Sequence, residues 1–475
     1  MIPALSFGRL WLGLAVLLPV LGALATPMST VDLAYHIRVG ETILATGAIP
    51  RADYLTFTAL GRPWVDQQWL AQVVFAATFG LGGWELLAVL RAALVGLIFG
   101  LVAASALAHG IAPRRAAWLS IAAFVVGVVT LSLRPQLLAM ALFAAGLLVV
   151  SVRRREPRAL WLLPVIGLLW ANVHGSFVLA PILAGFAWLE DLFDPDASSA
   201  RTLRIAAATF LATLLNPFGW GAWVYAFNLA ANPLVTTRIS EWQPTSFRTF
   251  AGLVFFASAL LLVAYLARRS ARTSWLTLAW LAFLFVVGAF AERGVAWWPL
   301  GAAVAVAGLL AADVRAGVLV SREPRPSMVN GAIAIVLGVA VLVLLPWWRP
   351  TEAMTARRGL LDEAPAGLVK AVADSTDVGA RLFVPQRWGS WFEFALPDRP
   401  VFVDSRVEVF PAAVWADEAA ISGGHDGWQA TLDRWAVDAI VVDAASGEEV
   451  AQRLSIEPGW VEAAADADGW LFVRR

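Results

Sequence analysis

The sequence predicts an α-helical polytopic membrane protein that carries a smaller α/β domain in its C-terminal part. Apolar residues make up 60% of the chain and charged residues 15%, which is more apolar surface than a soluble domain of this length can bury. Long apolar runs recur through residues 1–348, and arginines fall at alternate connections between them. After residue 348 the apolar runs give way to short segments that alternate between strand-like and helix-like patterns.

The apolar runs predict about eleven transmembrane helices, because each is about 16–25 residues long and a bilayer needs about 20. They begin near residues 9, 84, 116, 136, 159, 176, 203, 250, 273, 294 and 328. The first run, 10–27, also resembles a signal peptide with a cleavage site at 23–25. A retained helix is the simpler interpretation, because many further spans follow it.

The arginines predict the orientation, since cytoplasmic connections of membrane proteins are rich in Arg and Lys. They lie at alternate connections: Arg114 and Arg115, 153–158, Arg201 and Arg204, 268–272, and Arg315, Arg322 and Arg325. These connections are therefore expected in the cytoplasm. The connections at about 27–82 and 218–249 are then outer loops, and the odd number of spans places the C-terminal domain outside.

One apolar segment, 66–83, would invert every later arginine connection if it crossed the bilayer. We therefore expect an amphipathic helix that lies on the outer membrane surface, with Trp64 and Trp69 near the lipid headgroups.

The C-terminal segment 349–475 is predicted to be an α/β domain. Strands are expected at 381–385, 400–405 and 438–443, and helices at 362–374 and 427–436. The domain division expected from the sequence is thus 1–348 for the membrane part and 349–475 for the outer part.

Composition and missing motifs exclude several functions. The formal net charge is +0, which argues against a nucleic-acid partner. The chain has no cysteine, so disulfides, thiolate metal sites and cysteine nucleophiles are excluded. No phosphate-binding glycine loop, serine-hydrolase motif or zinc-ligand spacing is present, which disfavours a cytoplasmic nucleotide-sugar donor.

The predicted topology places the polar residues of interest at the outer ends of the helices, whereas the cytoplasmic connections carry mainly arginines. Ionisable groups near a membrane are costly and are candidates for function. The outer set comprises Asp32, Tyr35, His36, Arg38, Glu41, Asp53, Asp66, Arg134, Asn172, His174, Asn216, Glu241, Glu292 and Arg293. This concentration indicates a site for a polar ligand that arrives from the lipid.

Two motifs and the predicted architecture resemble the GT-C superfamily of integral-membrane glycosyltransferases. Segment 31–72, which reads Asp, His, Gly, Ile-Pro, Asp and Trp-Leu in order, is similar to bacterial members, and 239-ISEWQPT-245 is similar to a loop of oligosaccharyltransferase catalytic subunits. The resemblance implies a GT-C-like fold in a bacterial inner (plasma) membrane. It also implies a polyprenyl-phosphate sugar as donor and a glycan, lipid or protein as acceptor.

The sequence departs from the oligosaccharyltransferase pattern in two places. It has no Asp-x-Asp pair near the second span and no Trp-Trp-Asp motif in the C-terminal domain. A divalent cation (Mg or Mn) therefore stays open as a cofactor, and a metal-independent inverting mechanism is favoured.

The resemblance places Asp32 where the family has a catalytic base or metal ligand, with His36 one helical turn further on. The alternatives are a helix N-cap for Asp32 and an ordinary interfacial histidine for His36.

Arg134 and Arg293 are candidates for binding the lipid phosphate, with His174 as a further donor and Glu241 on the acceptor side. The alternatives are arginines that extend to headgroups, a histidine satisfied by backbone, and a glutamate in a surface loop. For Asp404 and Arg406 we favour a structural salt bridge over acceptor recognition.

Other functions stay open at this stage. A glycan could be transferred from a pyrophosphate lipid, as in an oligosaccharyltransferase or a ligase. A lipid or glycan transporter is disfavoured because the span interiors are nearly free of charge. A non-catalytic scaffold for envelope assembly is the remaining alternative.

Overall fold

The computed structural model describes residues 4–315, 326–348 and 359–475. Arg322 and Arg325, expected in a cytoplasmic connection, lie outside them. The chain forms two compact units, and each is described by itself. The helical unit comprises Met1–Thr26, Glu85–Ala231 and Ile239–Trp348. The mixed unit comprises Pro27–Trp84, Asn232–Arg238 and Arg349–Arg475, so that it joins the first predicted outer loop to the C-terminal segment. The expected division at residue 348 stays a prediction.

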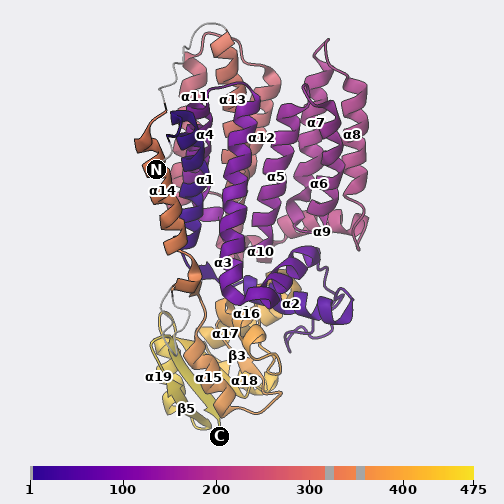
Figure 1. The fold of residues 1–475 in the computed structure, drawn as a ribbon. Helices are drawn as coiled ribbons and strands as arrows, with labels where there is room; N and C mark the ends of the chain where they lie inside the picture. Colours follow the sequence, from indigo (N-terminus) through magenta and orange to yellow (C-terminus); the bar gives the residue numbers. More distant parts are fainter. Residues whose placement is uncertain (1–3, 316–325, 349–358) are drawn as a thin grey trace. The chain divides into compact units, whose positions relative to one another are not determined.

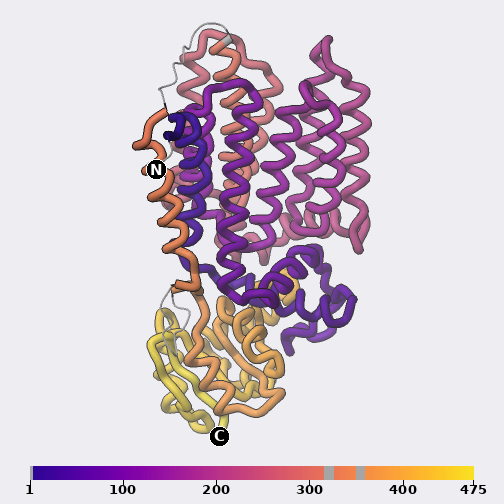
Figure 2. Tube along the Cα trace, in the orientation of Figure 1, coloured from indigo at the N-terminus to yellow at the C-terminus, as the bar shows by residue number. Residues whose placement is uncertain are grey.

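The helical unit is a bundle whose successive long helices run side by side in alternating directions (Figures 1 and 2). Its α-helices are α1 (Phe7–Ala25), the larger part of α3 (Trp69–Ala108), α4 (Pro113–Gly127), α5 (Pro135–Val152), α6 (Leu162–Ala171), α7 (Leu179–Leu192), α8 (Ser199–Ala212), α9 (Trp220–Ala231), α11 (Phe250–Arg268), α12 (Trp275–Phe290), α13 (Trp297–Arg315) and α14 (Met328–Val343). Short 3-10 helices precede or link several of them: η1 (Val128–Thr130), η2 (Pro157–Trp161), η3 (Gly175–Val178), η4 (Ser240–Trp242), η5 (Glu292–Ala296) and η6 (Pro346–Trp348).

A helix lies at each position where the sequence predicts a span, but the count of eleven transmembrane helices is not confirmed. Among the described residues, 7 helices are long and apolar enough to cross a membrane. Three more apolar helices are shorter, at Pro157–Ala171, Trp275–Phe290 and Met328–Val343. The remaining predicted span corresponds to α8, which is short and carries two arginines. The chain is a multi-pass membrane protein with a C-terminal sheet domain.

The two ends of the bundle differ in character. At one end the basic connections pair with acids at helix ends: Arg153 lies 3.0 Å from Asp191 and Arg269 lies 2.8 Å from Asp313. The opposite end holds the connections that contain Arg134, Glu241 and Arg293. The alternation of arginines in the sequence therefore corresponds to two different ends of the bundle, one with the basic connections and one with the candidate site.

The mixed unit is built on a small sheet of order β3-β4-β6-β5, in which β3 and β4 are parallel and the other pairs antiparallel. Its strands are β3 (Leu382–Phe383), β4 (Ala439–Asp443), β5 (Trp460–Ala465) and β6 (Gly469–Arg474), and β1 (Met28–Ser29) pairs separately with β2 (Leu361–Asp362). Its helices are α2 (Leu33–Thr46), α10 (Pro233–Arg238), α15 (Ala366–Ser375), α16 (Gln386–Ala395), α17 (Ala412–Ser422), α18 (Trp428–Trp435) and α19 (Glu448–Ile456), with η7 (Val407–Val409). The predicted α/β character is confirmed, although 400–405 contributes only isolated bridges from Val401 to Thr56 and Leu382.

Residues 69–81 form a helix of their own, as predicted, because α3 is interrupted by non-helical Gly82 and Gly83. This helix packs tightly on α2: a Cβ added at Gly40 would lie 2.1 Å from the Gln72 carbonyl oxygen. Gly40, the glycine of the 31–72 motif, therefore allows α2 and the 69–81 helix to approach closely. The expected headgroup position of Trp64 is wrong, since its side chain is buried and its ring lies 4.6 Å from the Arg406 guanidinium.

Candidate active site

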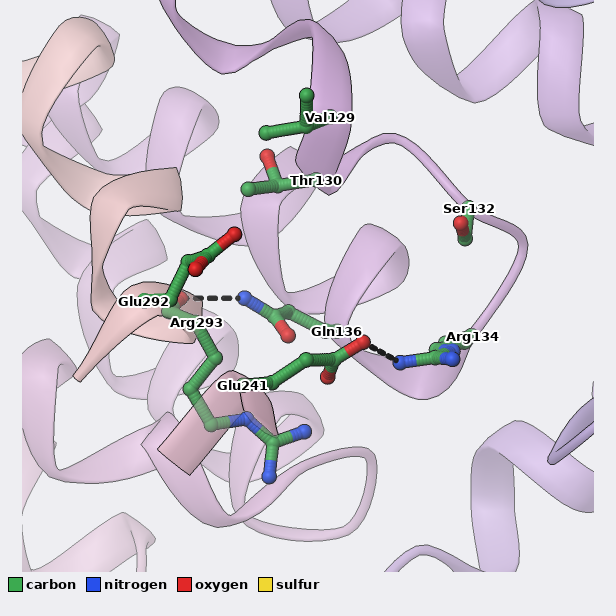
Figure 3. Close-up of a pocket in the computed structure, with 8 residues that line it drawn as sticks. All are labelled: Val129, Thr130, Ser132, Arg134, Gln136, Glu241, Glu292 and Arg293. Atoms are coloured by element: carbon green, nitrogen blue, oxygen red, sulfur yellow. Dashed lines mark hydrogen bonds and ion pairs between the residues drawn. The ribbon is translucent and has the colours of Figure 1, made fainter. Parts of the chain in front are cut away.

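A polar pocket opens at the end of the helical unit where the connections that carry Arg134, Glu241 and Arg293 meet (Figure 3). Its volume is about 70 Å³, enough for several water-sized groups. The lining residues come from three connections and comprise Val129, Thr130, Ser132, Arg134, Gln136, Glu241, Glu292 and Arg293. The structure thus brings together three of the predicted site residues, Arg134, Glu241 and Arg293.

Arg134 is held just outside α5 by the proline that follows it. Pro135 occupies the first helical position, where its fixed φ suits a helix and its missing N–H is not needed. A residue before proline is driven to extended backbone, and Arg134 has φ −136° and ψ 165°. Its side chain therefore projects from the helix end into the pocket.

Arg293 lies on η5, in the tight connection between α12 and α13. Gly294 makes this connection possible, because a Cβ there would lie 2.2 Å from the Val287 carbonyl oxygen. Gln136 Nε2 donates to the Arg293 carbonyl oxygen at 2.9 Å and ties η5 to the start of α5 (Figure 3). The two arginines are thus fixed by backbone geometry and by a hydrogen bond between their elements.

The polar loop 239–245 supplies the third side of the pocket. Glu241 binds Arg134 at 2.5 Å, and the neighbouring Trp242 ring lies 4.7 Å from the Arg293 guanidinium. Gln243 accepts a backbone hydrogen bond from Glu292 at 3.0 Å. Thr245 donates from its hydroxyl to Gly288 at 2.5 Å, which fixes the loop to the end of α12. Glu241, Trp242, Gln243 and Thr245 therefore tie this loop to other elements of the helical unit.

The two arginines of the pocket are suited to bind an anion. Two guanidinium groups can present paired donors to phosphate oxygens with the planar geometry that phosphate prefers. The side chains of Arg134 and Glu241 are 22% and 38% exposed, so a ligand can reach them.

His174 is not among the residues that line this pocket. It caps η3, where its Nδ1 accepts from the Ser176 backbone at 3.1 Å and contacts the Ser176 hydroxyl at 2.8 Å. This contact matches the structural alternative for His174, and its phosphate-binding role stays a prediction.

Asp32 and His36 belong to the mixed unit. Asp32 occupies the N-cap position of α2, but its side chain makes no capping hydrogen bond. The pKa of the neighbouring Tyr35 is raised well above its ordinary value, first by burial and then by the Asp32 carboxylate. His36 is buried, with its ring 4.1 Å from that of Tyr35 and 6.2 Å from that of Phe75. Asp32 therefore takes the N-cap position without the capping hydrogen bond that the structural alternative implies, and its catalytic role stays a prediction.

A buried ionic network lies close to these residues, and the sequence predicted only part of it. Arg406 Nε donates to Asp404 at 2.8 Å, which confirms the predicted structural salt bridge. Its guanidinium also donates to Asp53 at 2.6 Å. Burial, reinforced by Asp404, raises the pKa of Glu393 well above its ordinary value. The Asp53 contact was missed because its partner lies far away in the sequence.

Asp66 is a further buried acid of the mixed unit. Burial raises its pKa to about 7, against a smaller lowering by the hydrogen bond from Gln72 and by Arg406. The Gln72 bond is 2.8 Å long, whereas Asp66 Oδ2 has no hydrogen-bond partner among the described residues. Such a carboxyl is neutral when folded at mildly acidic pH and ionised when unfolded.

This difference predicts a pH-dependent contribution to stability. The unfolded state loses the Asp66 proton above pH about 4 and the folded state only above pH about 7, so stability falls with rising pH across that interval. We expect Asp66→Asn to gain roughly 2–3 kcal/mol relative to the natural protein between pH 5 and pH 8. Thermal unfolding of both proteins in detergent at the two pH values measures this. Parallel pH profiles would contradict it.

No group of three or more His, Asp or Glu side chains placed to hold a metal ion is found in the described ranges. The divalent cation stays open as a prediction.

The solved structures that resemble this chain include the following three proteins. An oligosaccharyltransferase of Archaeoglobus fulgidus, tethered to an acceptor peptide, aligns with TM-score 0.51 and 12% identity over 98% of this chain and 74% of that one. The arabinofuranosyltransferase AftD from Mycobacteria aligns with TM-score 0.58 and 19% identity over 99% of this chain, which spans 42% of AftD. ArnT from Cupriavidus metallidurans, bound to undecaprenyl phosphate, aligns with TM-score 0.53 and 15% identity over 98% of both chains.

These likenesses confirm the predicted GT-C-like fold. At such low identities they concern the fold alone. No known family profile and no curated protein matches the sequence.

Proposed function

We propose that this protein, which shares its fold with GT-C glycosyltransferases, transfers a sugar from a polyprenyl-phosphate donor to an acceptor at one face of the membrane. The observation that carries the proposal is the pocket in which Arg134 and Arg293 converge at one end of the bundle. Paired guanidinium groups at the end of membrane helices suit a phosphate that is anchored in lipid. The arginine distribution supports a reaction at the outer face, with the mixed unit outside. We place the reaction in a bacterial inner membrane, as the sequence resemblance implies.

A second, apolar pocket of the helical unit supports a lipid donor. It has a volume of about 400 Å³ and is lined by side chains of α11 and α12, with Trp298 and Phe247 at its edge. Phe247 follows Trp242 in the same connection, and Trp298 lies at the start of α13, directly after the η5 helix that carries Arg293. An isoprenoid tail can lie along these membrane helices while its phosphate reaches the arginines.

The proposed chemistry divides the roles among this chain's residues. Asp32, with His36 nearby, accepts the proton of the acceptor hydroxyl as that oxygen attacks the anomeric carbon. The bond from this carbon to the phosphate oxygen breaks, and Arg134 and Arg293 stabilise the charge left on the phosphate. His174 remains a candidate third donor to that phosphate. Glu241, which the sequence predicted on the acceptor side, contacts Arg134.

Purified full-length protein in detergent, incubated with a panel of radiolabelled polyprenyl-phosphate sugars and candidate acceptors, tests the function. We expect release of polyprenyl phosphate and a labelled product with at least one donor. Two guanidinium groups also match a pyrophosphate, so the panel includes a pyrophosphate-linked glycan as the alternative donor. A protein that releases neither lipid phosphate nor lipid pyrophosphate would support a non-catalytic role and overturn the proposal.

Arg293→Ala is expected to lower the turnover of this transfer by about 10²–10³-fold, because it removes one charged donor from the leaving phosphate. The turnover of Arg293→Lys should lie between those of the natural protein and Arg293→Ala, since a lysine keeps the charge but loses the paired donors. The matched control is Arg248→Ala, an arginine of the segment before α11 that does not line the pocket. Equal activity of Arg293→Ala and Arg248→Ala would exclude a phosphate contact.

A further inference from the structure

One three-residue helix, η4, contacts both arginines of the pocket. Its Glu241 carboxylate binds Arg134 at 2.5 Å, and its Trp242 ring packs 4.7 Å from the Arg293 guanidinium. Figure 3 shows the Glu241 side chain extending between the two arginines. The Arg134 donors that a phosphate would use are therefore already engaged by Glu241, and the same short element also packs on Arg293.

The charges of the pocket determine how strongly it attracts an anion. Its lining residues include two arginines, Arg134 and Arg293, and two glutamates, Glu241 and Glu292. Their formal charges cancel, so the pocket as it stands offers little net attraction to a phosphate. A carboxylate oxygen and a phosphate oxygen make the same kind of charge-assisted hydrogen bond to a guanidinium. Glu241 thus holds the place on Arg134 that a phosphate oxygen would take.

We propose that Glu241 is an exchangeable internal anion that competes with the lipid phosphate for Arg134 and thereby sets the affinity of the site for the product. This inference rests on the proposed function and assigns Glu241 to the phosphate side of the site. Phosphate binding displaces the carboxylate from Arg134, and the return of the carboxylate helps to expel the phosphate after the reaction.

The negative charge on the phosphate increases during sugar transfer, and exchange with Glu241 would counter the tighter binding that results. A sugar phosphodiester carries one negative charge. When the anomeric carbon–oxygen bond breaks, the electron pair stays on the phosphate, the acceptor oxygen bonds to the anomeric carbon, and the acceptor proton passes to a base. The resulting phosphate monoester carries about −1.5 to −2 charges at neutral pH. The product therefore binds two arginines more tightly than the donor, and a competing carboxylate counters that increase.

The solvent exposure of the Arg134–Glu241 ion pair indicates an exchangeable contact and not a structural one. The Arg134 and Glu241 side chains are 22% and 38% exposed, and an ion pair in contact with solvent is weak enough to exchange. Two pairs at the opposite end of the helical unit are buried by comparison, with 8% and 7% for Arg153 and Asp191 and 4% and 9% for Arg269 and Asp313, whereas Arg154 and Asp194 there are 53% and 25% exposed. The pair that borders the pocket is thus more open to solvent than the two buried pairs.

The test measures binding of farnesyl phosphate to the full-length protein in detergent micelles, with farnesol as the control for the tail. Glu241→Gln is expected to bind farnesyl phosphate about five-fold more tightly, which is the effect of removing a competing ion pair of ordinary strength. Glu292→Gln removes the same charge from the same pocket without touching the Arg134 pair, and its effect is expected to be smaller. Binding of farnesol should be equal in all proteins.

A double-mutant cycle isolates the exchange. In an Arg134→Ala background, Glu241→Gln should leave the affinity for farnesyl phosphate unchanged, because the contested partner is gone. If the natural protein and Glu241→Gln bind equally, the exchange is overturned while the phosphate site stands. Equal tightening by Glu241→Gln and Glu292→Gln, or tightening that persists without Arg134, would also overturn it, since simple charge repulsion then suffices. If none of the proteins binds farnesyl phosphate, the proposed phosphate site fails together with this inference.

Discussion

Asp32→Asn is expected to lower sugar transfer by about 10²–10⁴-fold, the usual contribution of a general base. Asparagine keeps the shape of the side chain but cannot accept the acceptor proton. The fold should survive, because Asp32 occupies the N-cap position of α2 without a side-chain capping bond. The helix therefore has no capping hydrogen bond to lose. Steady-state transfer with the donor identified in the panel measures the effect.

Glu41→Gln is the matched control for Asp32→Asn. Glu41 is an acid on the same helix, 40% exposed and 3.5 Å from Arg38, and its loss should leave transfer close to that of the natural protein. Elution volume in size-exclusion chromatography and the thermal unfolding temperature should be equal for both variants. A fully active Asp32→Asn protein would exclude Asp32 as the base.

Arg406→Met is expected to destabilise the mixed unit by about 3–5 kcal/mol, the typical cost of removing one partner from a buried ion pair. The substitution leaves the Asp53 and Asp404 carboxylates buried without a counter-charge. The side chains of Arg406, Asp53 and Asp404 are 2%, 0% and 0% exposed. Because Asp53 lies in the first predicted outer loop, that segment should become more sensitive to proteolysis in the full-length protein.

Arg434→Met is the control for this prediction. Arg434 forms an ion pair with Asp417 at 2.5 Å, but its side chain is 59% exposed, so its loss should cost about 0–1 kcal/mol. Adding Asp53→Asn and Asp404→Asn to Arg406→Met should restore part of the stability, since the unpaired charges are removed. Similar unfolding temperatures for Arg406→Met and Arg434→Met would show that the buried network contributes little.

Much of the architecture could be predicted because it depends on patterns of one segment at a time. Apolar length and the alternation of arginines predicted the helix positions and the two ends of the bundle. The break in α3 was predicted because a continuous span would have inverted the later arginine connections, and it lies at Gly82 and Gly83. The predicted number of spans is not confirmed, because α8 and three apolar helices are shorter than the 7 helices of the described residues that are long and apolar enough to cross a membrane.

The candidate site was predicted only as a set of residue types. Arg134, Glu241 and Arg293 were selected because they are ionisable groups at one end of membrane helices, and the structure places them around one pocket. The contact between Arg134 and Glu241 was not predicted, and neither was the packing of Trp242 on Arg293. Both depend on how Pro135 and Gly294 direct separate connections toward each other.

The sequence by itself determined the solvent of this protein, its helix positions and which ends of those helices are polar, because these follow from composition and local periodicity. Only the tertiary structure decided which polar residues meet. Asp53 and Arg406 are 353 residues apart and share a buried ion pair, and Trp64 was expected at headgroups but lies on Arg406. The local sequence pattern predicts how polar the surroundings of a residue are, whereas the residue that it contacts depends on the path of the whole chain.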